Sequence, residues 1–374
     1  MEFPFSFGRI VTGSQFVNRK KELAILKANI DHNIHTVLIS PRRWGKTSLI
    51  KYLSKKLSKD KNLKFVFIDL FTQSDELEFY EEYSRAVLKV ASSKLDEPGN
   101  HVQKFFKSIQ PSITIGTVAS GEFNVALQWE DIEKNYDEIL DLPEKLAKKR
   151  KQKFIICIDE FQCMEKFKDP GLFLSRLRSI WLHHTQVVYI LYGSKRHIMD
   201  KIFNSQNNPF YRFAEIMYLP KIKKKHFSQY IISTFKKSGK TIPKDRTIKI
   251  IELAERNPYF VQQLARYVWI KSSEMVVETD LQEAVDEIML QNAAWYIREV
   301  ERMTPPQFNY LKAVANKEQN LSGQEVLKKY KLGSSANVAK IKKVMEEREI
   351  LDYWNPYPEF NDPFFMQWIK KQNG

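Results

Sequence analysis

The stretch TVLISPRRWGKTSLI, residues 36–50, decides the fold of this chain. Residues 36–39 are a short apolar run that predicts a buried strand. Ser40 and Pro41 end that run, Gly-Lys-Thr follows at positions 45–47, and apolar residues then recur at helical spacing. A strand, a tight loop, Gly-Lys-Thr and a helix are the context that a phosphate-binding loop, or P-loop (Walker A motif), requires. A chance Gly-Lys-Thr in a basic loop is the alternative, and it would not need a strand and a helix on the correct sides.

The chemistry of this loop suits a nucleotide. Its backbone N–H groups and the N-terminus of the following helix present partial positive charge to a phosphate chain. Lys46 would reach the β- and γ-phosphates of ATP, and the hydroxyl of Thr47 would bind Mg²⁺. The other loop residues that we assign to the nucleotide are Ser40, Arg43, Trp44, Gly45 and Ser48.

Ser40 departs from the P-loop pattern, which has glycine at that position. The glycine relieves a tight turn, so serine is tolerated only if the backbone dihedral angles suit a residue with a side chain. If they do, the loop still binds phosphate, and the question left open is whether the affinity is weaker.

The run KFIICIDE, residues 153–160, is the second informative stretch. A strand of consecutive apolar residues is buried on both faces, and this one ends in two acids as a Walker B strand does. Asp159 would hold Mg²⁺ through a water molecule, and Glu160 would act as the general base on the attacking water. Such a match is common by itself. Its position about 110 residues after the P-loop, in an α/β pattern, favours the functional interpretation.

A third buried strand is predicted in VVYILYGS, residues 187–194. In P-loop ATPases that insert a strand between those of Walker A and Walker B, a polar residue at its end senses the γ-phosphate, a role open to Ser194 or Lys195. Arg212 follows in NPFYRFAE and is the candidate for an arginine finger that stabilises charge on the γ-phosphoryl group. A surface or ion-paired arginine is the alternative at that position.

The amino-acid composition limits the classes of binding partner but does not identify one. The chain has 374 residues and a net charge of +15, which suits an anionic partner such as a nucleotide, nucleic acid or an acidic protein surface. Cys157 and Cys163 show neither a metal-ligand spacing nor a disulfide framework, so a reducing cytoplasm is expected. No apolar run approaches the about 20 residues of a transmembrane helix, so no membrane partner is expected.

Other elements surround these motifs. A helix is predicted from Phe16, with Asn18 as its N-cap, and we assign Asn18 and Arg19 to the adenine side of the nucleotide, with simple packing as the alternative. A strand is predicted over 64–70 and a helix over 75–95, and the alternation in 112–127 predicts a β-hairpin inserted into the α/β core.

The region after Pro220 reads as helical. Residues 221–298 predict a small helical lid, and 299–374 predict a winged helix-turn-helix domain with Thr304 capping its first helix. Between Glu301 and Lys371 there are 12 basic and 9 acidic residues, so the positive charge does not concentrate there. DNA contact and protein packing therefore both remain open for this module. Its candidate phosphate contacts are Lys340, Lys342, Lys343 and Arg348.

Taken together, the chain resembles the prokaryotic AAA+-related ATPases of the archaeal type, near the STAND and origin-initiator branches. The motifs that carry this resemblance appear in the family's order over nearly the whole chain: FVNRKKEL, SPRRWGKTSL, FIICIDEFQ, LYGS, NPFYRFAE, RNPYFVQQLA and FNDPFFMQWI. The resemblance implies a P-loop α/β domain, a lid that contacts nucleotide near Pro258, a winged helix and a nucleotide-dependent switch. Arg256 stands where the family usually has glycine, which either adds a charge near the nucleotide or caps a helix differently.

We therefore predict an AAA+/ASCE-type P-loop domain over 1–220, a lid over 221–298 and a winged helix over 299–374. The expected activity is Mg-dependent hydrolysis of ATP to ADP, with Mg-ATP bridging the α/β core and the lid. Two alternatives are a DNA-binding protein regulated by ATP and a nucleotide-binding scaffold with little turnover. A protein partner or a homo-oligomer is compatible with each.

Overall fold

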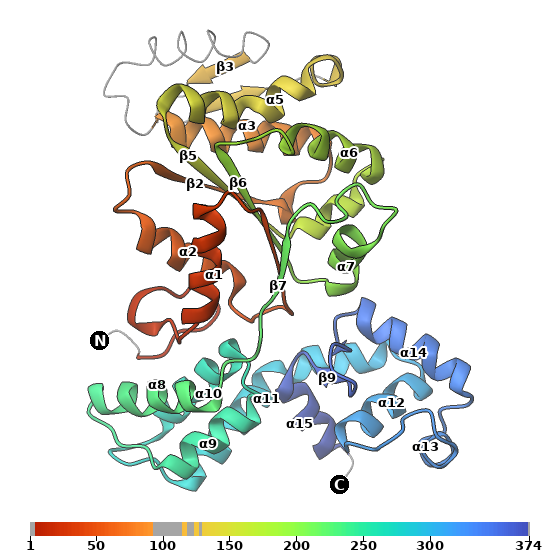
Figure 1. Ribbon diagram of the computed structural model, residues 1–374. Helices are drawn as coiled ribbons and strands as arrows, with labels where there is room; N and C mark the ends of the chain where they lie inside the picture. Colours follow the sequence, from red (N-terminus) through yellow and green to blue (C-terminus); the bar gives the residue numbers. More distant parts are fainter. Residues whose placement is uncertain (1–3, 93–113, 118–122, 127–128, 373–374) are drawn as a thin grey trace. The chain divides into compact units, whose positions relative to one another are not determined.

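The computed structural model describes residues 4–92, 114–117, 123–126 and 129–372 (Figure 1), and the side chains of 92–134 are not described. The chain divides into two compact units. The α/β unit comprises Arg19–Ser40 and Lys46–Pro220, and the C-terminal unit comprises Met1–Asn18, Pro41–Gly45 and Lys221–Gly374. Within the described residues, no helix combines the length and apolar character needed to cross a membrane.

A parallel five-stranded sheet forms the centre of the α/β unit, in the order β2-β5-β6-β1-β7. Strand β6 lies between β1, which leads into the P-loop, and β5, which carries the acidic pair. The predicted AAA+/ASCE-type sheet is therefore confirmed, with its extra strand in the expected place. The strands are β1 Thr36–Ile39, β2 Leu63–Asp69, β5 Lys153–Asp159, β6 Val187–Gly193 and β7 Glu215–Tyr218.

Helices cover this sheet, and α3 and α5 pack against β2, β5 and β6 (Figure 1). The two strands of the predicted hairpin, β3 Thr114–Thr117 and β4 Phe123–Ala126, pair antiparallel, while the rest of 112–127 lies outside the described residues. The helices of this unit are α1 Lys20–Asp31, α2 Lys46–Leu57, α3 Glu76–Ser92, α5 Trp129–Arg150, α6 Pro170–Trp181 and α7 Arg196–Asn204, with 3-10 helices η2 Leu70–Thr72 and η3 Phe161–Lys166.

Three local features differ from the sequence predictions. Helix α1 begins at Lys20 rather than Phe16, and Asn18 is not its cap because Arg19, in the left-handed region, occupies the N-cap position. Strand β7 was not predicted, since four residues give too short a pattern. Helix α5 was not predicted either, because it contains Pro143 and a kink at Asn135, both of which normally interrupt a helix.

Helices and one short two-stranded sheet follow Pro220 in the C-terminal unit. Thr304 lies at the N-cap of α12, and its N–H donates to Gln307 Oε1 at 3.0 Å, as predicted. Strands β8 and β9 pair antiparallel and form the wing. The elements are α8 Lys224–Lys237, α9 Lys244–Leu253, α10 Pro258–Lys271, α11 Glu278–Glu301, α12 Pro305–Ala315, α13 Gln324–Lys329, α14 Ser335–Glu347, β8 Leu351–Asp352, β9 Glu359–Phe360 and α15 Pro363–Lys371.

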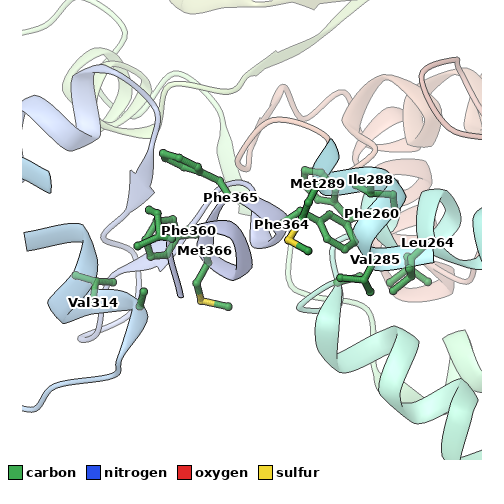
Figure 2. Packing of buried hydrophobic residues seen from close by; sticks show 14 of the residues in the cluster. Phe260, Leu264, Val285, Ile288, Met289, Val314, Phe360, Phe364, Phe365 and Met366 are labelled. Carbon is green, nitrogen blue, oxygen red and sulfur yellow. The ribbon is translucent and has the colours of Figure 1, made fainter. Parts of the chain in front are cut away.

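One continuous hydrophobic cluster joins the predicted lid and winged-helix segments. Figure 2 shows Phe364 of α15 beside Phe260 and Met289, and the rings of Phe260 and Phe364 lie 5.7 Å apart. Helix α15, which contacts both α11 and α12, was not predicted as a helix. The predicted boundary between residues 298 and 299 falls inside the uninterrupted helix α11, so the division of this unit into lid and winged helix stays a prediction.

Candidate functional site

The backbone of the loop after β1 explains why serine can replace glycine at position 40. Positive φ angles occur at Arg43 (65°) and Gly45 (87°), whereas Ser40 is not among the residues with positive φ. Only positive φ strongly favours glycine, so a side chain at position 40 introduces no backbone strain. The condition under which Ser40 is tolerated is met.

The P-loop lysine is turned back over its own loop. Lys46 is 6% exposed, and its Nζ donates to the carbonyl oxygen of Ser40 at 2.8 Å. Because Lys46 is the first residue of α2, its ammonium group adds to the positive end of the helix dipole. Both positive groups therefore lie where a phosphate chain would bind.

Thr47 and Asp159 meet although 112 positions separate them in the sequence. The hydroxyl of Thr47 donates to Asp159 Oδ2 at 2.6 Å, and the N–H of Glu160 donates to Asp159 Oδ1 at 2.9 Å. Burial raises the pKa of the Asp159 carboxyl to about 6, against the opposite effect of the Thr47 hydrogen bond. The structure thus places together the end of the P-loop and the end of β5, two strands away.

Glu160 follows Asp159 in the left-handed backbone region, with φ of 50°. Its Oε2 accepts hydrogen bonds from Ser194 Oγ, at 2.9 Å, and from the side-chain amide of Gln162. Ser194 comes directly after β6, the strand between β1 and β5. Ser194 and Gln162 thus both contact the carboxylate of Glu160. Gln162 was not predicted from the sequence.

The other predicted site residues lie elsewhere. Arg19 is 4% exposed, and its guanidinium donates to the carbonyl of Pro220 at 2.5 Å and to Glu22 at 3.3 Å, which fixes the start of α1 to the end of β7. Arg212 is exposed, with its guanidinium 5.0 Å from the ring centre of Tyr211. In the C-terminal unit, Asn18 has a φ of 53° and Pro258 is the first residue of α10.

Two arginines in the P-loop bind acids from the end of the chain. Arg42 Nε lies 3.1 Å from Glu349 Oε2, and Arg43 Nη1 lies 3.9 Å from Asp362 Oδ2. The guanidinium of Arg43 also lies over the ring of Tyr259, 4.8 Å from its centre. Arg43 was assigned from the motif, but Arg42 and both acids were missed, because these pairs depend on residues about 300 positions apart.

Asp362 is more than a partner for arginine. Its Oδ1 accepts from the N–H groups of Phe364 and Phe365, at 2.8 and 3.2 Å, and so caps α15. The hydroxyl of Tyr296 donates to Oδ2 at 3.4 Å. Burial raises the pKa of the Asp362 carboxyl, and Arg43 acts in the opposite direction.

Arg256 occupies a helix end. Its φ is 61°, in the left-handed region that glycine adopts most easily, and its N–H donates to the carbonyl of Ile251 at 3.0 Å. A glycine would suit this position, and Arg256 adopts the same left-handed backbone conformation after the end of α9. Of the two interpretations from the sequence, the structure supports the altered cap.

The oxygen atoms of Thr47 and Asp159 fit Mg²⁺, which prefers hydroxyl and carboxylate ligands and takes few of them from a protein. The Asp159 carboxylate is partly exposed, and burial is nevertheless the main cause that raises its pKa, with Lys46 acting in the opposite direction. A bound cation would further offset that burial. Searched over those residues, the structure contains no group of three or more His, Cys, Asp or Glu side chains suited to a metal. Thr47 and Asp159 would therefore supply one hydroxyl and one carboxylate ligand, with phosphate and water as the others.

Comparison with known proteins agrees with this geometry. Residues 16–264 match a family described as an ATPase domain predominantly from Archaea, and residues 294–371 match a probable winged helix domain. The fold is similar to that of the Walker-type ATPase paby2304 of Pyrococcus abyssi, with a TM-score of 0.67 and 14% identity over 98% of this chain and 99% of that one.

A second similar structure is the Aeropyrum pernix ORC2 protein, with a TM-score of 0.54 and 11% identity over 95% of this chain and 93% of that one. At these identities the likeness establishes the fold alone. None of the curated proteins matches the sequence significantly.

Proposed function

We propose a function from one premise: the chain belongs to the family of ATPase domains predominantly from Archaea, which matches residues 16–264. It binds ATP with Mg²⁺ and hydrolyses the nucleotide to ADP and phosphate. The observation that carries this proposal is the 2.6 Å hydrogen bond between Thr47 and Asp159. This bond joins the two residues expected to face the metal, one from each Walker motif.

In this proposal, residues of the α/β unit have different roles in binding Mg-ATP. Lys46 binds the β- and γ-phosphates, while Thr47 and Asp159 hold Mg²⁺ and its water ligands. When bound, Mg²⁺ neutralises negative charge that develops on the phosphate oxygens. Ser194 lies at the end of β6, where a hydroxyl can detect the γ-phosphate, and it contacts Glu160 directly.

Glu160 is the general base of the proposed reaction. The oxygen of a water molecule forms a bond to the γ-phosphorus, and the bond between that phosphorus and the β–γ bridging oxygen breaks. The electron pair of the broken bond leaves with ADP, and the proton of the water passes to the Glu160 carboxylate. A general base of this kind contributes roughly 10²–10⁴-fold to a rate.

The test compares wild type with Glu160→Gln and Lys46→Ala. We expect Glu160→Gln to bind Mg-ATP in calorimetry with wild-type affinity and to hydrolyse it at least about 100-fold more slowly. Lys46→Ala should lose binding, because its ammonium charge is removed from the phosphates. Equal turnover in wild type and Glu160→Gln would exclude Glu160 as the general base, and wild-type turnover no greater than that of buffer would leave the nucleotide-binding scaffold.

The same loop supports a switch role. Arg42 and Arg43 belong to the P-loop and pair with Glu349 and Asp362, which belong to the winged-helix match. Nucleotide that rearranges the loop therefore changes the contacts of these acids, and through them the segment that a partner would bind. Backbone hydrogen exchange of residues 349–362 should differ between Glu160→Gln with ATP bound and wild type with ADP bound. Identical exchange in both states would argue against the switch.

DNA binding is a second candidate function, favoured by exposed lysines on α14. Lys340 and Lys343 are exposed on this helix, although Lys343 Nζ lies 3.8 Å from Glu347 Oε1, whereas Arg348 is held by Glu299 at 2.7 Å. With so few exposed cations, affinity should be weak and should fall with salt at a slope of roughly −0.9 per phosphate contact, or about −1 to −2 in total. Absence of binding to duplex DNA at low salt would eliminate this candidate.

Assembly with a second copy is the remaining part of the proposal. Arg212 is exposed and its guanidinium contacts only the ring of its neighbour Tyr211 among the described contacts, so it is available to the γ-phosphate of another subunit. If so, ATP turnover per chain rises with protein concentration, and Arg212→Ala removes that rise without altering ATP affinity. Turnover per chain that stays constant with concentration would leave Arg212 as a surface residue.

A further inference from the structure

Gln162 is a buried polar residue beside the acidic pair, and the proposed function leaves it without a role. It lies in η3 and is 3% exposed. Its side-chain Nε2 donates to Glu160 Oε2 and lies 3.5 Å from Ser194 Oγ. The hydroxyl of Ser194 donates to the same Glu160 oxygen. Two donors from different elements therefore converge on one oxygen of the proposed base.

The chemistry of the contact sets the orientation of the Gln162 amide. A carboxylate only accepts hydrogen bonds, so the amide must turn its NH₂ group toward Glu160. The carbonyl oxygen, Oε1, then points the other way, and it is buried without a hydrogen-bond partner within the described part of the chain. An unpaired buried carbonyl destabilises the folded state, so this orientation is maintained at the expense of stability.

Gly193 supplies the space for that carbonyl. A Cβ at position 193 would lie 2.0 Å from Gln162 Oε1 and 2.7 Å from Met199 Sδ. Gly193 does not have a positive φ, so the backbone does not require glycine there. A larger residue at the end of β6 would therefore require the side chains of Gln162 and Met199 to move.

We propose that Gln162 is a positioning residue that, with Ser194, holds Glu160 Oε2 so that Oε1 accepts the proton of the attacking water. This inference rests on the proposed ATPase function and deepens it. A glutamate side chain has three rotatable bonds, and in a fixed position it has less conformational freedom to lose when the reaction begins. Gln162 itself does not touch the substrate and acts through Glu160.

The main variant is Gln162→Met, which has a similar shape but lacks the amide donor and the unpaired carbonyl. We expect kcat to fall roughly 10- to 100-fold, part of the full contribution of a general base. The KM for Mg-ATP and the ADP affinity in calorimetry should stay within about twofold. Thermal stability should not decrease, because no buried carbonyl is left unpaired.

Gln263→Met is the matched control, since Gln263 is also buried with an unpartnered Oε1 but lies in α10 of the C-terminal unit. It should change kcat by less than about twofold. In the double variant Glu160→Gln with Gln162→Met, turnover should be no lower than in Glu160→Gln alone, because Gln162 acts only through Glu160. Additive losses would mean that Gln162 acts by another route.

A readout without nucleotide uses backbone hydrogen exchange. In nucleotide-free protein, exchange over residues 160–166 should be faster in Gln162→Met than in wild type, and unchanged in Gln263→Met. Gly193→Ala displaces the side chain of Gln162 while residue 162 stays glutamine, and it should reproduce the loss of kcat. This variant replaces Gln162→Met in the test if Gln162→Met does not fold.

The outcomes separate the two proposals. If Glu160→Gln loses turnover while Gln162→Met and Gly193→Ala keep wild-type kcat, the positioning role is wrong and the ATPase stands. If wild type hydrolyses ATP no faster than Glu160→Gln, Glu160 is not the base and the positioning role fails with it, and if wild type shows no turnover above buffer, the ATPase proposal fails as well.

Discussion

The carboxylates of the two compact units face different partners. In the α/β unit, Asp159 and Glu160 accept hydrogen bonds from hydroxyl, amide and N–H groups, all of which are neutral. In the C-terminal unit, Glu349 and Asp362 meet the guanidinium groups of two arginines. Both sets are partly or wholly withdrawn from water, but among the described residues only the second lies within ion-pair distance of protein cations, while Lys46 acts on Asp159 from farther away.

The difference indicates what each set does. A carboxylate that is largely withdrawn from water and lacks an ion-pair partner destabilises the fold, and a bound cation or a proton reduces that cost. A carboxylate paired with arginine is already neutralised and stabilises the contact between two segments. In the proposed function Asp159 and Glu160 take part in metal binding and proton transfer, whereas Glu349 and Asp362 pair with arginines of the P-loop.

The largest expected effect separates Asp159 from Asp362. Asp159→Ala should reduce kcat/KM for Mg-ATP by roughly 100-fold or more, because the metal loses its carboxylate, while stability stays equal or rises. Asp362→Ala should lower the free energy of unfolding by about 2 kcal/mol, since it removes a helix cap and a buried partner of Arg43. Steady-state kinetics and urea denaturation of both variants measure these effects. The comparison breaks if Asp362→Ala costs more turnover than Asp159→Ala.

The second prediction concerns pH in the absence of metal. Asp159 binds its proton near pH 6 in the folded state and near pH 3.8 when unfolded. Between these values the folded state holds more protons, so the free energy of unfolding falls as pH rises and levels off above pH 6. Since Asp159 is partly exposed, water screens part of this effect, and the free energy of unfolding falls by a total of about 1–2 kcal/mol. In EDTA, Asp159→Asn should remove this fall and be more stable than wild type at pH 7, and parallel curves for the two proteins would contradict it.

The contact between the P-loop and the end of β5 could be predicted because both sequence signals are local. A strand, a loop and a helix follow one another around Lys46 and Thr47, and an apolar run ends in Asp159 and Glu160. The carboxyl ends of parallel strands share one edge of a sheet, so the contact between Thr47 and Asp159 follows from the fold class. The place of β6 between β1 and β5 was predicted from the order of the motifs, and the winged helix from the helical pattern and two short strands near the end of the chain.

Other features have no local signal. Gln162 follows a recognised motif, but only the folded structure brings it against Ser194, 32 positions away. Arg42 pairs with an acid about 300 positions later, which neither periodicity nor spacing encodes. Strand β7 is held in place by pairing with β1, and its exposed Glu215 weakens the pattern that would identify a strand. Tertiary contacts override local propensity in each case.

The third prediction tests whether Arg43 and Asp362 act as a pair. Arg43 is about half exposed, but its guanidinium also lies over the rings of Tyr259 and Phe260, so its contribution exceeds that of an ordinary surface pair. A double-mutant cycle with Arg43→Met and Asp362→Asn should give a coupling energy of about 1 kcal/mol in urea denaturation. Asn keeps an acceptor for the cap of α15, so the cycle isolates the charge. A coupling energy near zero would assign Asp362 to the cap alone.

The smallest effect is expected for Arg42 and Glu349, whose side chains are 49% and 24% exposed. At 3.1 Å their ion pair has good geometry, but water and salt screen it, so the cycle of Arg42→Met and Glu349→Gln should give roughly 0.2–1 kcal/mol. The coupling should shrink as salt approaches 1 M, where the Debye length is about 3 Å, while that of Arg43 with Asp362 should fall less because Asp362 is buried. If both couplings fell equally with salt, the carboxylates of the C-terminal unit would be solvated surface groups. Their contrast with Asp159 and Glu160 would then reflect exposure and not the presence of a built-in cation.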